Sequence, residues 1–214
     1  MRKLLPDFKD KRVLDLGCGY GWHCIYAMEH GASSVVGVDI SHKMLEVAKE
    51  KTHFPQVEYK CCAIEDVEFP EESFDVILSS LAFHYVADYE ILVKKIYRIL
   101  KSGGNLVFTV EHPVFTAYGT QDWYYNKKGE ILHFPVDNYY YEGKRTAVFL
   151  GEKVTKFHRT LTTYLNTLLS NGFIINHIVE PQPPEYMMDI PGMQDEMRRP
   201  MMLIVSANKN CYTT

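Results

Sequence analysis

The sequence contains no apolar run that approaches the ~18 residues needed to span a bilayer. Its first residues, MRKLLPDFKDK, carry charge but no apolar segment of signal-peptide length. Lys and Arg number 23 against 27 Asp and Glu, and they form no cluster long enough to attract a phosphate backbone strongly. We therefore predict a cytoplasmic protein with neither a membrane nor a nucleic acid among its partners.

The cysteines also lack the spacing of a metal site. None of the paired CxxC spacings of zinc sites is present, and adjacent Cys61 and Cys62 point in opposite directions if they lie in a strand. The others are Cys18, Cys24 and Cys211. We expect reduced thiols and no metal site. Internal repeats and low-complexity tracts are absent too, so a single domain over residues 1–214 is predicted.

What the sequence does contain is a regular alternation of apolar strands and amphipathic helices. Strands are predicted at residues 12–16, 34–38, 57–62, 74–80 and 105–110. Helices are predicted at residues 22–29, after the capping residue Ser41, and at residues 89–100, where Ser102, Gly103 and Gly104 end the helix. Such alternation is typical of an α/β fold with a doubly wound, mostly parallel sheet.

The pattern changes after residue 110. Residues 112–157 show no strong helical period and carry many aromatic side chains, namely Trp123, Tyr124, Tyr125, Tyr139, Tyr140 and Tyr141. We interpret this segment as an inserted, hairpin-like, Tyr-rich cap that encloses a small substrate, with a partner interface or a packed layer as alternatives. A helix at 160–169 and strands at 173–179 and 201–207 are predicted to follow.

A glycine-rich turn follows the first predicted strand. Gly17, Gly19 and Gly21 allow backbone conformations that side chains disfavour and let a ligand approach the helix that begins next. Asp39, twenty residues beyond Gly19, ends the second strand, where a carboxylate can accept both hydroxyls of a ribose. Trp22 stands where the dinucleotide fingerprint requires a third glycine, and no P-loop lysine follows, which disfavours nicotinamide enzymes and ATPases.

Four ordered blocks carry a resemblance to a known family. DLGCGYG, GVDIS, AIEDVEFPEESFDVILSSLAFHYV and LKSGGNLVF together resemble the class I S-adenosylmethionine-dependent methyltransferases, over roughly residues 12–110. Within that superfamily the chain is most similar to the small-molecule branch related to quinone-biosynthesis methyltransferases. The resemblance implies a Rossmann-like, seven-stranded sheet whose last strand, at 201–207, is antiparallel to the others.

The resemblance also implies a set of cofactor-binding residues. Gly17, Cys18 and Gly19 would contact the methionine part of the cofactor, with Asp15 beneath the turn near its amino group. Asp39, followed by Ile40, would bind the ribose. The adenine would pack on Met44 and lie beside Ile64 and Glu65, and residues 79–81, including Ser79 and Leu81, would line the methyl group. Relatives often carry Asp at position 63, which is Ala63 here, so Glu65 or Asp66 would have to replace it.

Histidines are the natural acid or base candidates, because the imidazole pKa lies near working pH. His84, His112 and His158 fall at the ends of predicted elements on the expected cofactor side, and each is also compatible with a structural role. His84 and His112 are favoured because they follow strands four and five. Glu185, Arg198 and Arg199 lie between the last two strands, and nothing in the sequence favours substrate contact over surface ion pairs for them.

The acceptor is expected to be a small molecule. The DPPY-like motif of amine-methylating DNA enzymes would lie at the end of strand four, where this chain has SSLAFH. We predict direct displacement of the activated methyl, with a general base optional and the acceptor atom (O, N, S or C) open. Two alternatives stay open: a non-catalytic protein that binds S-adenosylmethionine, and a nicotinamide-dependent oxidoreductase.

The first strand begins by residue 12, whereas relatives carry some tens of residues before it that fold over cofactor and substrate. The sequence therefore predicts either an open crevice or a cover from elsewhere. The Tyr-rich insertion or another chain, by domain exchange, would supply that cover. This feature is also the main support for the non-catalytic alternative, because a protein without a substrate lid is expected to be weakly active.

Overall fold

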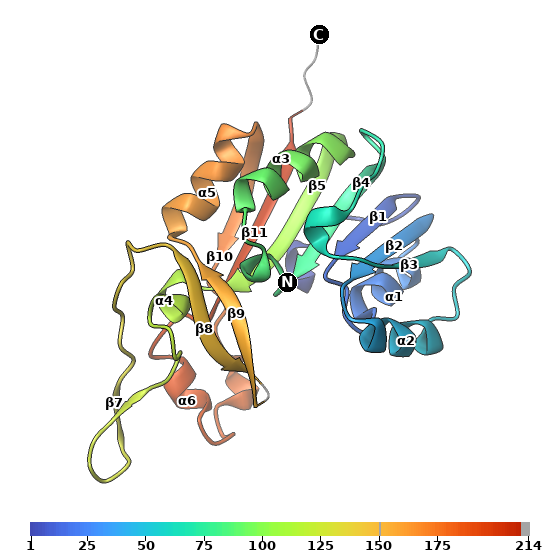
Figure 1. Cartoon of the computed structure of the whole chain (residues 1–214). Helices are drawn as coiled ribbons and strands as arrows, with labels where there is room; N and C mark the ends of the chain where they lie inside the picture. The colour runs from blue at the N-terminus through green and yellow to red at the C-terminus, as the bar shows by residue number, and fades with distance from the viewer. Residues whose placement is uncertain (150, 211–214) are drawn as a thin grey trace.

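The computed structural model describes residues 1–149 and 151–210, in which a seven-stranded sheet is covered by helices on both faces (Figure 1). Its strands, in spatial order, are β10 (Phe173–Val179), β11 (Met202–Lys209), β5 (Leu100–Glu111), β4 (Phe74–Ser80), β1 (Arg12–Leu16), β2 (Ser34–Asp39) and β3 (Val57–Cys61). β11 runs antiparallel to both of its neighbours, and the other pairs are parallel. The predicted fold class and the antiparallel last strand are confirmed.

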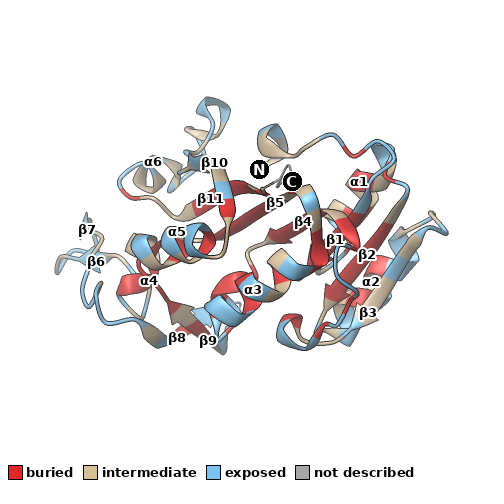
Figure 2. Cartoon of the chain, turned by 90° about the horizontal axis from the view of Figure 1, so that it is seen from above, coloured by how far each residue is buried: buried red, intermediate tan, exposed pale blue. Residues whose placement is uncertain are grey.

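The covering helices are α1 (Trp22–Glu29), α2 (His42–Lys51), α3 (Tyr89–Ile99) and α5 (Leu161–Ser170). α3 and α5 share one buried cluster with strand residues such as Leu14 and Phe108. α1 and α2 share a second cluster with Val13 and Val35. Figure 2 shows buried residues concentrated in the central strands. Successive side chains of a strand point to opposite faces, so two-sided burial explains why the strands read as continuous apolar runs.

The start of β5 differs from the sequence prediction. The helix before it ends at Ile99, and Gly103 and Gly104 lie inside the strand rather than at the end of the helix. Gly103 has a φ of +75°, and the pairing with β4 shifts register between Phe74 and Val76. An irregular strand can hold extra residues in this way, and glycine permits the required backbone conformation.

The segment after β5 contains a short helix, α4 (Pro113–Ala117), and two antiparallel hairpins. The hairpins are β6 (Tyr124–Tyr125) with β7 (Ile131–His133), and β8 (Gly143–Phe149) with β9 (Glu152–His158). Figure 1 shows the β6–β7 hairpin projecting away from the sheet. The connection between β10 and β11 contains the short helix α6 (Met193–Glu196), which the sequence did not predict.

Several short 3-10 helices complete the described chain: η1 (Arg2–Leu4), η2 (Ile64–Asp66), η3 (Phe83–Tyr85) and η4 (Glu185–Met187). No helix within the described ranges is long and apolar enough to cross a membrane. Cys18, Cys24, Cys61 and Cys62 form no disulfide, and Cys211 lies outside the described residues.

Candidate active site

The carboxyl ends of β1, β2, β4 and β5 meet at one edge of the sheet, because these neighbouring strands are parallel. In open α/β sheets, ligands bind at this edge, near the point where the strand order reverses. Strand β1 lies at that point, since the chain proceeds from β1 to β2 on one side and returns to β4 on the other. The residues that follow β1 and its neighbours are therefore the candidates for a site.

The glycine turn after β1 is shaped by packing at two positions and is open at the third. The φ values are +78° at Gly17, +52° at Gly19 and +77° at Gly21. A Cβ on Gly17 would lie 2.4 Å from the Cβ of Ala82, and one on Gly21 would lie 2.3 Å from the Oη of Tyr59. A Cβ on Gly19 would meet only the Sδ of Met44, at 3.9 Å. Gly19 is thus where a ligand can approach the backbone closely.

Asp39 is tied to this turn by backbone amides. Its Oδ2 accepts a hydrogen bond from Gly19 N at 2.8 Å, and its Oδ1 accepts one from Ser41 N at 2.8 Å. Ser41 in turn caps α2 by accepting from Met44 N at 3.3 Å. Because each carboxylate oxygen has further lone pairs, the fixed Asp39 can still accept hydrogen bonds from a ligand. Ile40, the next residue, is 74% exposed at this edge.

Asp15 lies fully buried beneath the turn, as the sequence prediction places it. Its Oδ2 lies 3.5 Å from Cys24 Sγ, and its Oδ1 has no hydrogen-bond partner among the described residues. Burial raises the pKa of this carboxyl to about 7, and the nearby charge of Asp39 adds to the rise. A buried acceptor without a donor is unfavourable, so a cationic or donor group brought to Asp15 would stabilise its ionised form.

The residues predicted at the adenine edge differ in their accessibility. Met44 is partly buried on α2, whereas Ile64 is buried in the core at the start of η2. Glu65 is exposed, and its carbonyl oxygen accepts a hydrogen bond from Lys95 at 2.5 Å. The exposed apolar surface here is instead that of Ile40.

The end of β4 corrects one prediction. Ser79 is fully buried, and its hydroxyl donates to the carbonyl oxygen of Leu16 at 2.8 Å, so it fastens β4 to β1 and offers no free group to a cofactor. Leu81 has a φ of +55°, which is unfavourable for a residue with a Cβ. Its N–H donates to the carbonyl oxygen of Thr109 and lies 3.0 Å from the Thr109 hydroxyl. Such strain, held by neighbours, is concentrated at functional sites.

Two of the three predicted histidines take structural positions. His158 is fully buried, with Nδ1 2.7 Å from the Thr116 hydroxyl and Nε2 2.9 Å from the carbonyl oxygen of Tyr139. A carbonyl only accepts, so Nε2 carries the proton and both nitrogens are used. His112 caps α4 through Nδ1, and its Nε2 lies 2.8 Å from the Glu180 carboxylate. Burial lowers the pKa values of both rings. Both rings are therefore engaged within the protein, and substrate contact by either stays a prediction.

His84, in η3 directly after β4, is the histidine that stays at the candidate edge. Its Nδ1 accepts a hydrogen bond from Glu111 N at 3.4 Å, which leaves the proton on Nε2. Burial lowers the pKa of His84 to about 4, so the ring is neutral near pH 7. The neighbouring Tyr85 is 40% exposed, and burial together with Glu111 raises the pKa of its phenol. Tyr85 therefore presents an accessible hydrogen-bond donor, and the Nε2 proton of His84, which is only 1% exposed, is a second donor beside it.

A buried polar network that the sequence did not reveal fastens the inserted segment beside these donors. Lys156 of β9 donates to Glu111 Oε1 at 2.5 Å and to the amide oxygen of Gln121 at 3.0 Å. The Gln121 amide nitrogen donates to the second oxygen of Glu111 at 2.8 Å. Gln121 and Lys156 are 10 and 45 residues from Glu111. No sequence pattern relates residues at such distances.

Arg159, also missed, is buried and holds the backbone around η3. It donates to the carbonyl oxygens of Val86 and Ala87, the latter at 3.0 Å. Its guanidinium also lies over the rings of Tyr89 and Tyr164, at 5.4 and 5.9 Å from their centroids. Arg159 thus positions the segment that carries His84. The only sequence signal was a charged residue between a strand and a capping threonine, which is too common to be informative.

The chain is similar to known proteins over nearly its whole length. The family described as "Methyltransferase domain" matches residues 14–108. A structure assigned to an S-adenosylmethionine-dependent methyltransferase of Listeria monocytogenes is 57% identical, with a TM-score of 0.95, and the match covers 98% of this chain and 94% of that one. An S-adenosylmethionine-dependent methyltransferase of Mesorhizobium loti is 39% identical, with a TM-score of 0.89 and coverage of 97% and 95%.

A relative from quinone metabolism matches a smaller part of the chain. The ubiquinone biosynthesis O-methyltransferase of Coxiella burnetii is 35% identical over 51% of this chain and 47% of its own length. That match supports the superfamily, whereas the Listeria and Mesorhizobium structures match at high identity from end to end. The chain therefore belongs to the class I S-adenosylmethionine-dependent methyltransferases, and S-adenosylmethionine is its cofactor.

Proposed function

We propose that this methyltransferase acts on a small-molecule acceptor that reacts at the carboxyl ends of β4 and β5, while the cofactor is held at the ends of β1 and β2. One observation carries the proposal: the hydrogen bond of 2.8 Å between Gly19 N and Asp39 joins the open glycine and the ribose-binding candidate into one preformed unit. The acceptor donors His84 and Tyr85 follow β4, the strand next to β1.

The residues at the β1–β2 edge fit the cofactor in shape and charge. Because Gly19 has no Cβ, a cofactor group can approach its backbone closely and fill the space that a side chain would occupy. Asp15, with its unpartnered Oδ1, suits an ammonium group, and the half-buried Asp39 suits ribose hydroxyls. Gly17 and Cys18 would contact the methionine part, and Ile40 and Met44 the adenine. Ile64, Glu65 and Leu81 would complete the cofactor site through backbone or side-chain contacts.

The mechanism we propose requires little proton chemistry from the protein. The cofactor, when bound, supplies a methyl group on a positively charged sulfur that is already activated for displacement. The protein contributes alignment and exclusion of water. His84 donates from Nε2, so it orients an acceptor by hydrogen bonding, and removing a proton would first require its tautomer to change. An acceptor that is nucleophilic without a protein base is therefore favoured.

A small acceptor is also consistent with the segment that borders this edge. The Glu111–Gln121–Lys156 network binds the inserted segment directly to the end of β5. Residues 112–157 therefore form, in our proposal, the wall of the acceptor site. The net charge of −4 gives no general attraction to nucleic acids. We extend the proposal to a cytoplasmic location, because the cysteine pattern is that of reduced thiols.

Calorimetry with S-adenosylmethionine, S-adenosylhomocysteine and NAD, combined with a methyl-transfer screen of small acceptors, tests the proposal. We expect the first two to bind and NAD not to bind. Preferential binding of NAD would refute the cofactor placement. Tight binding of S-adenosylmethionine without transfer to any of a broad set of small acceptors, while a macromolecule is methylated, would refute the acceptor class.

A further inference from the structure

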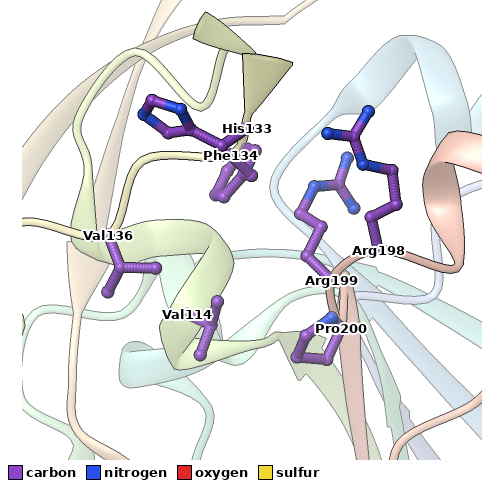
Figure 3. A pocket seen from close by; sticks show the side chains of 7 residues that line it. All are labelled: Val114, His133, Phe134, Val136, Arg198, Arg199 and Pro200. Atoms are coloured by element: carbon purple, nitrogen blue, oxygen red, sulfur yellow. The ribbon is translucent and has the colours of Figure 1, made fainter. Parts of the chain in front are cut away.

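A cavity of about 280 Å³ lies beside α4, next to the carboxyl end of β5. Figure 3 shows Arg198 and Arg199 on one side of it, Val136 on the opposite side, and Val114 and Pro200 below. His133 also contributes to the wall. Among the residues that the structure describes, no Asp or Glu lines this cavity, so its charged side chains are cationic.

Arg199 is held rigidly by its surroundings. It is only 9% exposed, and its guanidinium lies over the rings of Phe115, Trp123 and Phe134 at 4.6, 4.9 and 4.7 Å. Its two terminal nitrogens lie 2.8 and 3.1 Å from the carboxylate oxygens of Glu196. Its Nε is buried without a hydrogen-bond partner in the described chain. A buried donor on a cation without an acceptor is unfavourable, and a bound anion would correct it.

Arg198 adds donors that remain partly accessible. Its side chain is 38% exposed. One terminal nitrogen lies 3.0 Å from Asp195, and the other donates to the carbonyl oxygen of Leu132 at 2.6 Å. A guanidinium has five N–H donors, and these contacts use only part of them. The planar fork of an arginine matches a carboxylate in geometry as well as in charge.

We propose that this cavity binds the carboxylate of the methyl acceptor, so that the acceptor class is a small organic anion with an apolar body. The N–H groups that Arg198 and Arg199 do not use on Asp195 and Glu196 select a carboxylate. The apolar side formed by Val114, Val136 and Pro200 selects a hydrocarbon framework over an inorganic ion. The part of the inference that concerns the acceptor rests on the function proposed above.

The cavity is within reach of the reacting edge. Val114 lies three residues after Glu111, so their Cα atoms are at most about 11 Å apart at about 3.8 Å per residue. Glu111 N in turn lies 3.4 Å from His84. The cavity therefore borders the same sheet edge as the acceptor donors, and the proposal requires an acceptor long enough to bridge the two.

The first test uses benzoate and its neutral isostere benzamide as probes, titrated by calorimetry or NMR in the presence of S-adenosylhomocysteine. We expect benzoate to bind at least about tenfold more tightly, because charge-assisted hydrogen bonds form only with the anion. Val136 is 52% exposed, so the fold tolerates substitution there. Val136→Asp should abolish benzoate binding by placing a carboxylate opposite the arginines, whereas the isosteric Val136→Asn should retain most of it.

A second pair of variants examines the arginines. Arg198→Gln should weaken benzoate binding by about fivefold to tenfold. The control is Arg98→Gln, which removes an exposed arginine of α3 that pairs with Glu68, and it should leave benzoate binding unchanged. Equal affinity for benzoate and benzamide, or equal binding by the Val136→Asp and Val136→Asn variants, would overturn the site.

The acceptor assignment has its own readout. In a methyl-transfer screen, carboxylate acceptors should be used in preference to the matched amides, and Val136→Asp should remove that preference without changing the affinity for S-adenosylhomocysteine. Transfer only to neutral acceptors, unchanged in the Val136→Asp variant, would overturn the assignment while leaving the proposed methyltransferase function intact. If the wild-type protein did not bind S-adenosylhomocysteine, the proposed function itself would be wrong.

Discussion

The β1–β2 side of the catalytic edge is fixed by backbone amides, whereas the β4–β5 side is fixed by long-range side-chain contacts. Asp39 takes its two hydrogen bonds from Gly19 N and Ser41 N, which are 20 and 2 residues away. Glu111 is held by Lys156, 45 residues away, and Arg159 bonds to Val86 across 73 residues. The proposed cofactor side is therefore built by one local strand, turn and helix unit, and the proposed acceptor side depends on how the inserted segment docks.

This difference would allow related enzymes to keep one cofactor while their acceptors vary. Backbone amides provide the same geometry whatever side chains surround them, so the cofactor site does not depend on the insertion. Side-chain networks can be rebuilt when an inserted segment changes. We expect variants of the two sides to separate cofactor affinity from the stability of the acceptor side.

The largest effect is expected from Gly17→Ala, because the glycine turn is tightly packed at this position. The new Cβ would lie 2.4 Å from Ala82 Cβ in a backbone with φ of +78°, so overpacking and left-handed strain should together lower the free energy of unfolding by about 4 kcal/mol. Denaturant unfolding measures it. Gly129→Ala is the control, because its φ is +80° and no atom lies within 4 Å. Equal losses in both variants would show that packing against Ala82 is unimportant.

Lys156→Met should break the acceptor side alone. The side chains of Lys156 and Glu111 are 3% and 15% exposed, so an unpaired Glu111 carboxylate should cost about 3 kcal/mol of unfolding free energy. The double variant with Glu111→Gln should recover much of the loss. As a control, Lys101→Met removes a more exposed pair with Asp75 and should cost less than about 1 kcal/mol. A parallel fall in S-adenosylhomocysteine affinity would contradict the independence of the two sides.

Asp15 predicts a pH dependence of stability that is specific to the cofactor side. Its folded-state pKa of about 7 exceeds the ordinary value of 3.8, so the unfolded chain releases this proton first. The contribution of Asp15 to stability therefore falls as pH rises from about 4 to about 7. Between pH 5 and pH 8 the loss should be roughly 2.5 kcal/mol, and the Asp15→Asn variant should lack it. Identical pH profiles of unfolding free energy for the two proteins would show that Asp15 ionises normally.

Asp39→Asn should weaken the cofactor while sparing the acceptor side. An amide offers one oxygen where two backbone N–H groups and the ribose hydroxyls require acceptors, so the binding free energy of S-adenosylmethionine should fall by roughly 1–3 kcal/mol. Calorimetry on the folded variant measures this loss. The control is Asp88→Asn, because the Asp88 carboxylate also accepts a hydrogen bond from a backbone amide, that of Ile91, at 3.0 Å. A cofactor affinity that is the same in wild type and Asp39→Asn would remove Asp39 from the site.

Elements whose signals are local were predicted closely. The strands at Arg12–Leu16, Phe74–Ser80 and Phe173–Val179 and the helix at Trp22–Glu29 have the predicted bounds, because burial and turn residues mark them directly. The start of β5 was wrong, since the same glycines that end helices also permit an irregular strand. The helix α6 was not predicted, because only four residues of the polar connection form it.

The candidate site likewise divides into residues with a local sequence signal and residues whose role depends on partners distant in the chain. Gly19 and Asp39 were predicted from spacing and Asp15 from the family resemblance, and the backbone that connects the three residues also fixes their geometry. Strand order favoured His84 and His112 over His158, but it did not show which rings are engaged within the protein, because that depends on the partner that each ring nitrogen meets. Those partners, Glu111 N for His84 and Thr116 with Tyr139 for His158, come from other elements.

By itself, the sequence determined the alternating α/β order, the glycine turn and its distance to Asp39, because these depend on backbone conformation and on contacts within one βαβ unit. Only the tertiary structure decided the protonation of Asp15, the docking of Lys156 on Glu111 and the enclosure of Arg199 by three aromatic rings. Each of these depends on removal from water and on partners supplied by elements distant in the chain, and neither burial nor such pairing is encoded in any local pattern.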